Sequence, residues 1–189
     1  MAAVLTTACQ NDDTDFSAYT NGTASSTSAN VINIVYNSTS VAVTGDDNGY
    51  VTVNGTDVTV KTGTNTDSLL LVLSGTCSDG SLLIYREKKY GIKLNGLTLN
   101  NADGPAINNQ CGKSLYLNVA SGTTNTLTDG TSYTEQSYDQ KGALFSEAQL
   151  IFSGSGKLSV TSTGGKAGIS SDDYVRVLDA PTITVSADK

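Results

Sequence analysis

The chain has 189 residues, including 19 glycines and two prolines, and a formal net charge of −7. This acidic balance excludes nucleic acid as the expected partner, because nucleic-acid binding needs a basic surface. The sequence has no histidine, which excludes a Ser-His-Asp triad and most zinc enzymes but leaves oxygen sites for hard cations open. At this length we expect one domain with one continuous core.

The N-terminus reads MAAVLTTAC, a short apolar run that ends in small residues and Cys9. Residues 5–9 resemble the cleavage motif of a bacterial lipoprotein signal, although the usual basic segment before it is missing. Lipidation of Cys9 would anchor the protein in the cell envelope of a bacterium, as an outer-membrane lipoprotein or at the cell surface. No other stretch approaches the ~20 apolar residues of a membrane-spanning helix. The alternative is a short apolar tail with an incidental cysteine.

Residues 10–30 are rich in Ser, Thr, Asn and Asp and show no hydrophobic period. This composition predicts a flexible polar stalk between the lipidated residues 1–9 and a folded domain at residues 31–189. The apolar segments at residues 31–36 and 40–44 predict the first strands, which would cap the open end of the core.

Short apolar clusters, bounded by Gly, Ser, Asp or Pro, continue from there to the end of the chain. Clusters of this length suit strands and leave no room for helices. They predict about five coils of three strands each: 50–53, 58–61 and 69–73; 82–85, 91–94 and 97–99; 105–107, 115–119 and 125–127; 142–145, 149–152 and 156–160; 167–170, 174–177 and 181–185.

The last two coils repeat one another with a shift of 25 residues (144 to 169). Without a gap, five apolar residues of one copy align with five of the other: Leu144 with Ile169, Leu150 with Val175, Phe152 with Val177, Leu158 with Ile183 and Val160 with Val185. A fixed period with three short strands in each repeat predicts an all-β solenoid, the parallel β-helix, in which each coil covers the one below. The chain stops after a third strand without an obvious cap, so we expect a fragment whose later coils are missing.

A polar insertion at residues 129–141, DGTSYTEQSYDQK, separates the third coil from the fourth. Insertions in solenoids tend to gather on the binding face. The tyrosines at 133 and 138 could stack on a sugar ring while the carboxylates at 129 and 139 bind its hydroxyls. The predicted ligand-binding residues are therefore Asp129, Tyr133, Tyr138 and Asp139. The alternative is a mobile polar loop.

The repeat also places Glu147 opposite Asp172 on the neighbouring coil, with the two carboxylates ~4.8 Å apart. Like charges at this spacing repel each other unless a cation intervenes. Calcium prefers several oxygen ligands, which a turn that includes Asp173 could complete. Glu147, Asp172 and Asp173 are therefore the predicted calcium ligands. The alternative is a solvated acidic corner.

A cationic cluster at residues 86–89, with sequence REKK, is the single candidate for the base of a lyase, in which Lys or Arg removes a proton next to a uronate carboxylate. A charged turn between strands explains the same residues, and no catalytic residue is predicted.

Several motifs along residues 40–185 resemble a bacterial carbohydrate-binding family first described from a clostridial cell-surface polysaccharide-binding protein. These motifs are LNGLTLNN with DGPAIN at residues 94–108, TNTLTDG at 124–130, ALFS at 143–146 and GISSDD at 168–173. The resemblance implies a right-handed parallel β-helix, calcium binding, attachment to plant cell-wall or acidic polysaccharides and a distant likeness to pectate lyases. The family usually has an acidic pair after the ALFS segment, where this chain has Glu147 and Ala148.

Together, the residues and the resemblance predict a monomeric cell-surface protein that binds polysaccharide with the help of calcium. A bridging calcium ion would reconcile a net charge of −7 with an acidic polysaccharide. Two alternatives remain open: a polysaccharide lyase with the same architecture, and an adhesin or scaffold with a protein partner.

Overall fold

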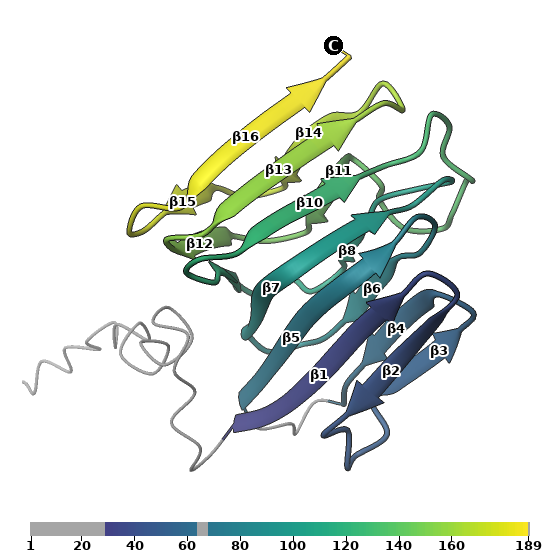
Figure 1. Cartoon of the computed structure of the whole chain (residues 1–189), viewed down its shortest axis with the longest axis vertical. Coiled ribbons are helices and arrows are strands. Elements are labelled where there is room, and N and C mark those ends of the chain that lie inside the picture. The colour runs from purple at the N-terminus through teal and green to yellow at the C-terminus, as the bar shows by residue number, and fades with distance from the viewer. Residues whose placement is uncertain (1–28, 64–67, 189) are drawn as a thin grey trace, which may run out of the picture.

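The computed structural model describes residues 29–63 and 68–188, which form strands and turns only (Figure 1). Within these two ranges no helix is long and apolar enough to cross a membrane. The all-β prediction is confirmed for this part of the chain. Cys9 and residues 10–28 of the predicted stalk lie outside the described residues. The last two residues of that stalk, Ala29 and Asn30, already belong to the first strand.

The described residues form sixteen strands: β1 (Ala29–Asn37), β2 (Ser40–Thr44), β3 (Val51–Asn54), β4 (Asp57–Lys61), β5 (Ser68–Cys77), β6 (Leu82–Tyr85), β7 (Tyr90–Asn100), β8 (Ile107–Asn109), β9 (Leu115–Val119), β10 (Thr124–Thr128), β11 (Gly142–Ser146), β12 (Leu150–Gly154), β13 (Lys157–Ser162), β14 (Ala167–Ser171), β15 (Val175–Val177) and β16 (Thr182–Ala187).

The strands form two sheets of mixed direction. The second sheet has the order β14-β11-β8-β6-β4-β3 and carries the features described below. The first sheet contains the remaining strands. Its main path is β15-β12-β9-β7-β10-β13-β16, and off this path β5 pairs with β7, β1 with β5 and β2 with β1. Pairing is antiparallel in β1–β2 and β3–β4 and parallel in the other pairs.

The predicted register of the repeat is confirmed. Strand β11 pairs with β14, β12 with β15 and β13 with β16, all in parallel. Each of the five predicted contacts is present: Leu144 with Ile169, Leu150 with Val175, Phe152 with Val177, Leu158 with Ile183 and Val160 with Val185. The row that contains Leu144 continues on the neighbouring strands, where Leu144 pairs with Ile107, Ile107 with Leu82 and Leu82 with Val58. Neighbouring turns of the chain therefore stack without a register change along this row.

The core lies between the two sheets and is built from the inward residues of these rows. Val58, Leu82, Ile107 and Leu144 are fully buried, and Ile169 packs against them. Burying an aliphatic side chain of this size stabilises the fold by about 1.5–3 kcal/mol. The alternate residues on the same strands point outward and are free to form a surface.

The structure differs from the predicted coil strands at two places. Residues 50–53 were expected to begin the first coil, but β3 forms an antiparallel hairpin with β4. Gly55, with a φ of 64°, occupies the left-handed turn between them, a conformation that glycine adopts without steric cost. The separate strands expected at 91–94 and 97–99 are one long strand, β7, whose corner lies at Gly96, with a φ of 81°.

Candidate functional site

The insertion at residues 129–141 leaves β10 and returns to β11 without forming a strand, as the sequence predicts. Figure 1 shows it as a long connection at the edge of the stacked strands. Hydrogen bonds to β8 and to the turn that precedes it hold the loop in place. The amide of Asn108 on β8 donates to the backbone oxygen of Asp139 over 3.0 Å, and the backbone N–H of Thr134 donates to the Asp103 oxygen over 2.8 Å. The loop therefore covers part of the second sheet.

Asp129 anchors the start of the loop to the following coil. Its side chain is only 2% exposed, and it accepts hydrogen bonds from the backbone N–H of Thr163 and the hydroxyl of Ser162, each over 2.6 Å. It also accepts a bond from the hydroxyl of Tyr133 over 2.7 Å. Burial, together with this bond and the charge of Asp129, raises the pKa of Tyr133. The predicted ligand residues Asp129 and Tyr133 therefore contact each other, and the carboxylate of Asp129 is bonded within the protein.

A pocket of about 230 Å³ lies between the loop and the second sheet. Its walls come from β4 and β6, from the turn between β7 and β8, and from the loop itself. The lining side chains include two carboxylates, four amides and one phenol: Asp57, Asp103, Asn101, Asn108, Gln136, Gln140 and Tyr138. Tyr138 is therefore the predicted ligand residue that the structure places in a pocket.

The ring of Tyr138 is held by an edge-to-face contact with Tyr85 of β6. The ring centroids are 6.3 Å apart, and the planes meet at 82°. Partial burial raises the pKa of Tyr138, and the charges of Tyr85, Asp103 and Asp57 raise it further. The phenol is thus neutral at physiological pH and lies beside two acidic groups.

The two pocket carboxylates keep acceptor capacity for a ligand. Asp57 accepts one bond from the hydroxyl of Ser81 over 2.7 Å, and Asp103 accepts one from the hydroxyl of Thr134 over 3.3 Å. A carboxylate can accept about four hydrogen bonds. Both side chains are exposed, so their remaining oxygen lone pairs can bind hydroxyl groups.

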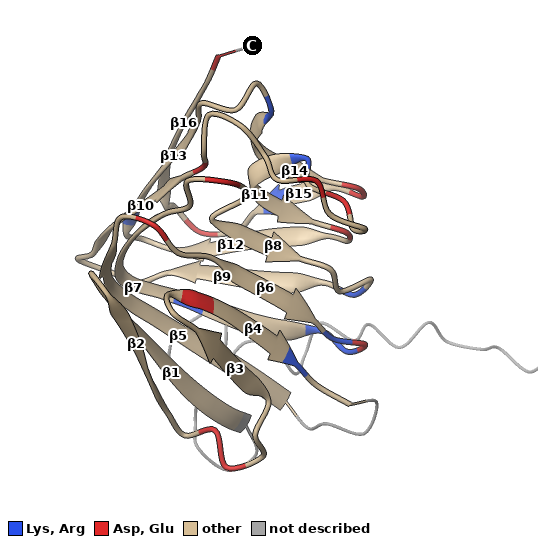
Figure 2. Cartoon of the chain, turned by 90° about the vertical axis from the view of Figure 1, so that its right-hand side faces the viewer, with Lys and Arg blue, Asp and Glu red and all other residues tan. Residues whose placement is uncertain are grey.

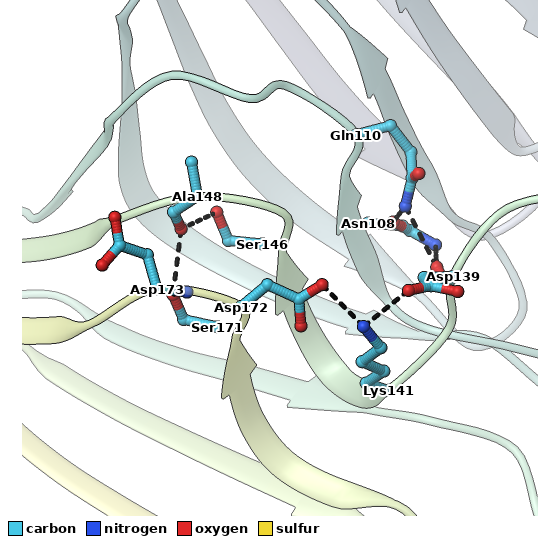
Figure 3. A network of polar contacts seen from close by, with 9 residues as sticks. All are labelled: Asn108, Gln110, Asp139, Lys141, Ser146, Ala148, Ser171, Asp172 and Asp173. Carbon is cyan, nitrogen blue, oxygen red and sulfur yellow. Dashed lines mark hydrogen bonds and ion pairs between the residues drawn. The ribbon is translucent and has the colours of Figure 1, made fainter.

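A cluster of acidic residues lies next to the pocket, where the loop ends (Figure 3). The carboxylates of Asp139, Glu147 and Asp172 each have an oxygen within 4.8 Å of the others. The Nζ atom of Lys141 lies 2.5 Å from the carboxylate of Asp139 and 2.6 Å from that of Asp172. The structure thus brings the predicted ligands Glu147 and Asp172 together, and it adds Asp139, which was expected to bind sugar.

Asp173 does not join the acid cluster. Figure 3 shows its carboxylate pointing away from Lys141, and it accepts a hydrogen bond from the amide of Gln149 over 2.7 Å. Asp172 and Asp173 lie in the bend between β14 and β15, and only Asp172 contributes a carboxylate to the cluster. The predicted calcium ligand Asp173 thus lies apart from Glu147 and Asp172 in this structure.

The environment of the cluster shifts the pKa values of Glu147 and Lys141. Burial raises the pKa of Glu147, and the charges of Asp172 and Asp139 raise it further, against the opposing effect of Lys141. Hydrogen bonds to Asp139 and Asp172 raise the pKa of Lys141. Three carboxylates fit the oxygen preference of a hard cation, but the ammonium group of Lys141 already lies between two of them. A calcium ion would have to displace Lys141.

Figure 2 shows the strands of the second sheet with the charged residues of the chain coloured, and acidic residues gather near β11, β14 and β15. The pocket and the acid cluster share this side, because Asn108 lines the pocket and also bonds to Asp139. They are neighbouring parts of one polar surface.

The sequence patterns did not predict Asp57, Tyr85, Asp103 or Asn108 as ligand-binding residues, although Asp103 and Asn108 belong to the DGPAIN motif. Asn108 follows Thr59 and Leu83 in one outward row across β4, β6 and β8. The alternation of the strands indicates that this row faces outward. What the alternation does not show is which part of the row the loop encloses.

Three comparisons bear on identity. Residues 54–189 match the family model described as carbohydrate-binding domain-containing protein. A solved structure, titled as the polysaccharide lyase-like protein from C. thermocellum in a gadolinium derivative, is similar with a TM-score of 0.67 and 21% identity. The similarity covers 82% of this chain but only 61% of that one, so the chain spans less than two thirds of the similar structure. No curated protein matches the chain.

The family match contains most of the chain, the pocket and the acid cluster, and the chain belongs to the family of carbohydrate-binding domain-containing proteins.

Proposed function

We propose that the protein binds a polysaccharide in the pocket between the loop at residues 129–141 and the second sheet. The observation that carries the proposal is the ring of Tyr138, held by Tyr85 within a pocket of carboxylates and amides. Membership of a carbohydrate-binding family supports the same assignment.

The chemistry of the pocket suits a sugar ring. A pyranose presents apolar C–H faces that can pack on an aromatic ring, and its equatorial hydroxyls need both donors and acceptors. Tyr138 supplies the ring, Asp57 and Asp103 supply acceptors, and the amides of Gln136 and Gln140 supply both. The volume of about 230 Å³ is below the roughly 300–1,000 Å³ of drug-sized pockets, which favours a short section of a longer chain.

Replacing Tyr138 with alanine is expected to weaken polysaccharide binding roughly tenfold, because the aromatic platform and its fixed orientation are lost. Affinity electrophoresis in gels that contain plant cell-wall polysaccharides measures the effect. The matched control is Tyr174→Ala, since Tyr174 is 46% exposed beside β15 and outside the pocket. Equal binding by the Tyr138 variant and the unchanged protein would show that the sugar binds elsewhere.

We also propose that the stacked coils form a right-handed parallel β-helix. The continuous parallel pairing of β4, β6, β8, β11 and β14 supports this arrangement. Parallel crossover connections are right-handed in about 98% of cases, which favours the right hand.

We propose in addition that calcium binds at Asp139, Glu147 and Asp172 when Lys141 moves aside. An ion there could bridge the protein to a carboxylate of an acidic polysaccharide. The support is the convergence of three carboxylates at the end of the loop that borders the pocket.

Calcium is expected to bind roughly three- to tenfold more tightly to Lys141→Met than to the unchanged protein, because the competing positive charge is removed. Titration calorimetry with calcium alone measures the affinity, and Lys166→Met is the control because Lys166 is exposed and outside the cluster. Binding should weaken on acidification at a pH above the ordinary range of a glutamate, because the pKa of Glu147 is raised and its protonated form cannot bind the ion. Absence of heat with both proteins would contradict a calcium site.

Catalysis is a second candidate, because the similar solved structure is titled polysaccharide lyase-like. The cationic cluster at residues 86–89, which was the candidate for the base of a lyase, gives catalysis no support. Arg86 is 4% exposed, and its Nε donates to the backbone oxygen of Lys88 while Nη1 donates to Thr62, so Arg86 stabilises a turn. We propose binding without cleavage. Release of product absorbing in the unsaturated-uronate band would establish a lyase instead, and failure to retain any glycan would favour an adhesin with a protein partner.

We propose that the protein acts as a monomer attached to the bacterial cell surface through lipidated Cys9. The support is the resemblance of residues 1–9 to a lipoprotein signal.

A further inference from the structure

The pocket has an unusual balance of charge for a site that would take an acidic sugar. It contains the carboxylates of Asp57 and Asp103 and four side-chain amides. Of the described residues that line it, none is lysine or arginine. Both carboxylates are exposed to an incoming ligand, and each accepts a hydrogen bond from a neutral hydroxyl, that of Ser81 for Asp57 and that of Thr134 for Asp103.

The surroundings of the pocket add to this negative charge. Asn108 and Gln110 both donate to the backbone oxygen of Asp139, each over 3.0 Å, so the acid cluster begins where the pocket ends. Lys141 is committed to two of the three acids in that cluster and brings one positive charge to three carboxylates. A ligand chain that leaves the pocket on this side therefore meets further carboxylates.

We propose that the pocket itself, without calcium, selects neutral, hydroxyl-rich glycans and rejects uronic acids; this rests on the proposed polysaccharide binding. A calcium ion would act only at the neighbouring acid cluster, outside the residues that line the pocket. Hydroxyl groups can donate to Asp57 and Asp103 and exchange hydrogen bonds with the amides. A uronate carboxylate in the same place would lie beside two like charges without a counter-charge. Repulsion of the wrong ligand is a common source of specificity.

The test compares binding to neutral xylan and mixed-linkage β-glucan with binding to polygalacturonate, by affinity electrophoresis in the presence of a calcium chelator. The unchanged protein is expected to bind a neutral glycan at least tenfold more tightly than polygalacturonate. In the double variant Asp57→Asn/Asp103→Asn, this preference is expected to fall roughly fivefold, because repulsion of the uronate is removed. The control Asp47→Asn/Asp188→Asn has the same net charge but lies at exposed positions outside the pocket, and it should retain the original preference.

The possible failures are distinguishable. Tighter binding of polygalacturonate than of both neutral glycans, with chelator present, would overturn the neutral selectivity and leave polysaccharide binding standing. An unchanged preference in the pocket double variant, or an equal fall in the control, would overturn the role of Asp57 and Asp103. Binding to none of the three polysaccharides would overturn the proposed function and the selectivity together.

Discussion

Replacing Asp129 with alanine is expected to lower the free energy of unfolding by about 2–4 kcal/mol and to weaken polysaccharide binding at the same time. The buried carboxylate accepts bonds from Thr163, Ser162 and Tyr133. Its removal leaves three donors without their acceptor in a region closed to water, which costs more than the loss of an exposed bond. The start of the loop is then free to leave the following coil, and Tyr138 at its other end loses its fixed position.

Denaturant unfolding and affinity electrophoresis measure the two effects of Asp129→Ala. The matched control is Glu135→Ala, which removes an exposed carboxylate from the same loop and should change the free energy of unfolding by less than about 0.5 kcal/mol. A stable Asp129 variant that binds normally would show that the buried hydrogen bonds do not position the loop. A destabilised variant with normal binding below its unfolding transition would separate stability from pocket geometry.

Replacing Gly75 with alanine is expected to destabilise the protein by about 3 kcal/mol or more. Gly75 has a φ of 93° at a β-bulge in the pairing of β5 with β7. A Cβ atom there would lie 2.0 Å from the backbone oxygen of Tyr36, so β1 would have to shift away from β5. The shift would also disturb the buried ring of Tyr36, whose hydroxyl donates to the Ser81 oxygen over 2.8 Å.

Gly96→Ala is the matched control for Gly75→Ala. Gly96 has a similar φ of 81°, but a Cβ atom would meet nothing within 4 Å. Its variant should carry only the cost of the left-handed backbone, about 1–2 kcal/mol. Thermal and denaturant unfolding compare the two proteins, and equal destabilisation would show that the close approach of Tyr36 to Gly75 is relieved without cost.

Much of the fold could be predicted because its strand pairs follow a short repeat. The contact of Leu144 with Ile169 requires only that one coil covers the next, and a fixed shift in the sequence then determines the register. The same reasoning brought Glu147 and Asp172 together, since both directly follow paired strand residues, Ser146 and Ser171.

The sequence-based predictions differ from the structure where the chain leaves the repeat. The hairpin of β3 and β4 is antiparallel, although its residues alternate like those of a coil strand. Within the loop, Asp129 and Asp139 look equivalent in the sequence, yet Asp129 is buried and Asp139 is exposed. A polar residue in a long loop can bond to the protein or to solvent, and local composition does not distinguish the two.

Most strand positions, the stacking of the last coils and the extent of the polar insertion could be predicted from the sequence. These features depend on side-chain alternation and on a constant repeat length, which are local properties of the chain. Three features became visible in the folded chain alone: Tyr138 meets Tyr85, Asp57 and Asp103 share a pocket, and Lys141 lies between Asp139 and Asp172. Each of these contacts depends on how an irregular loop folds over strands from distant parts of the sequence, and no period in the sequence encodes that path.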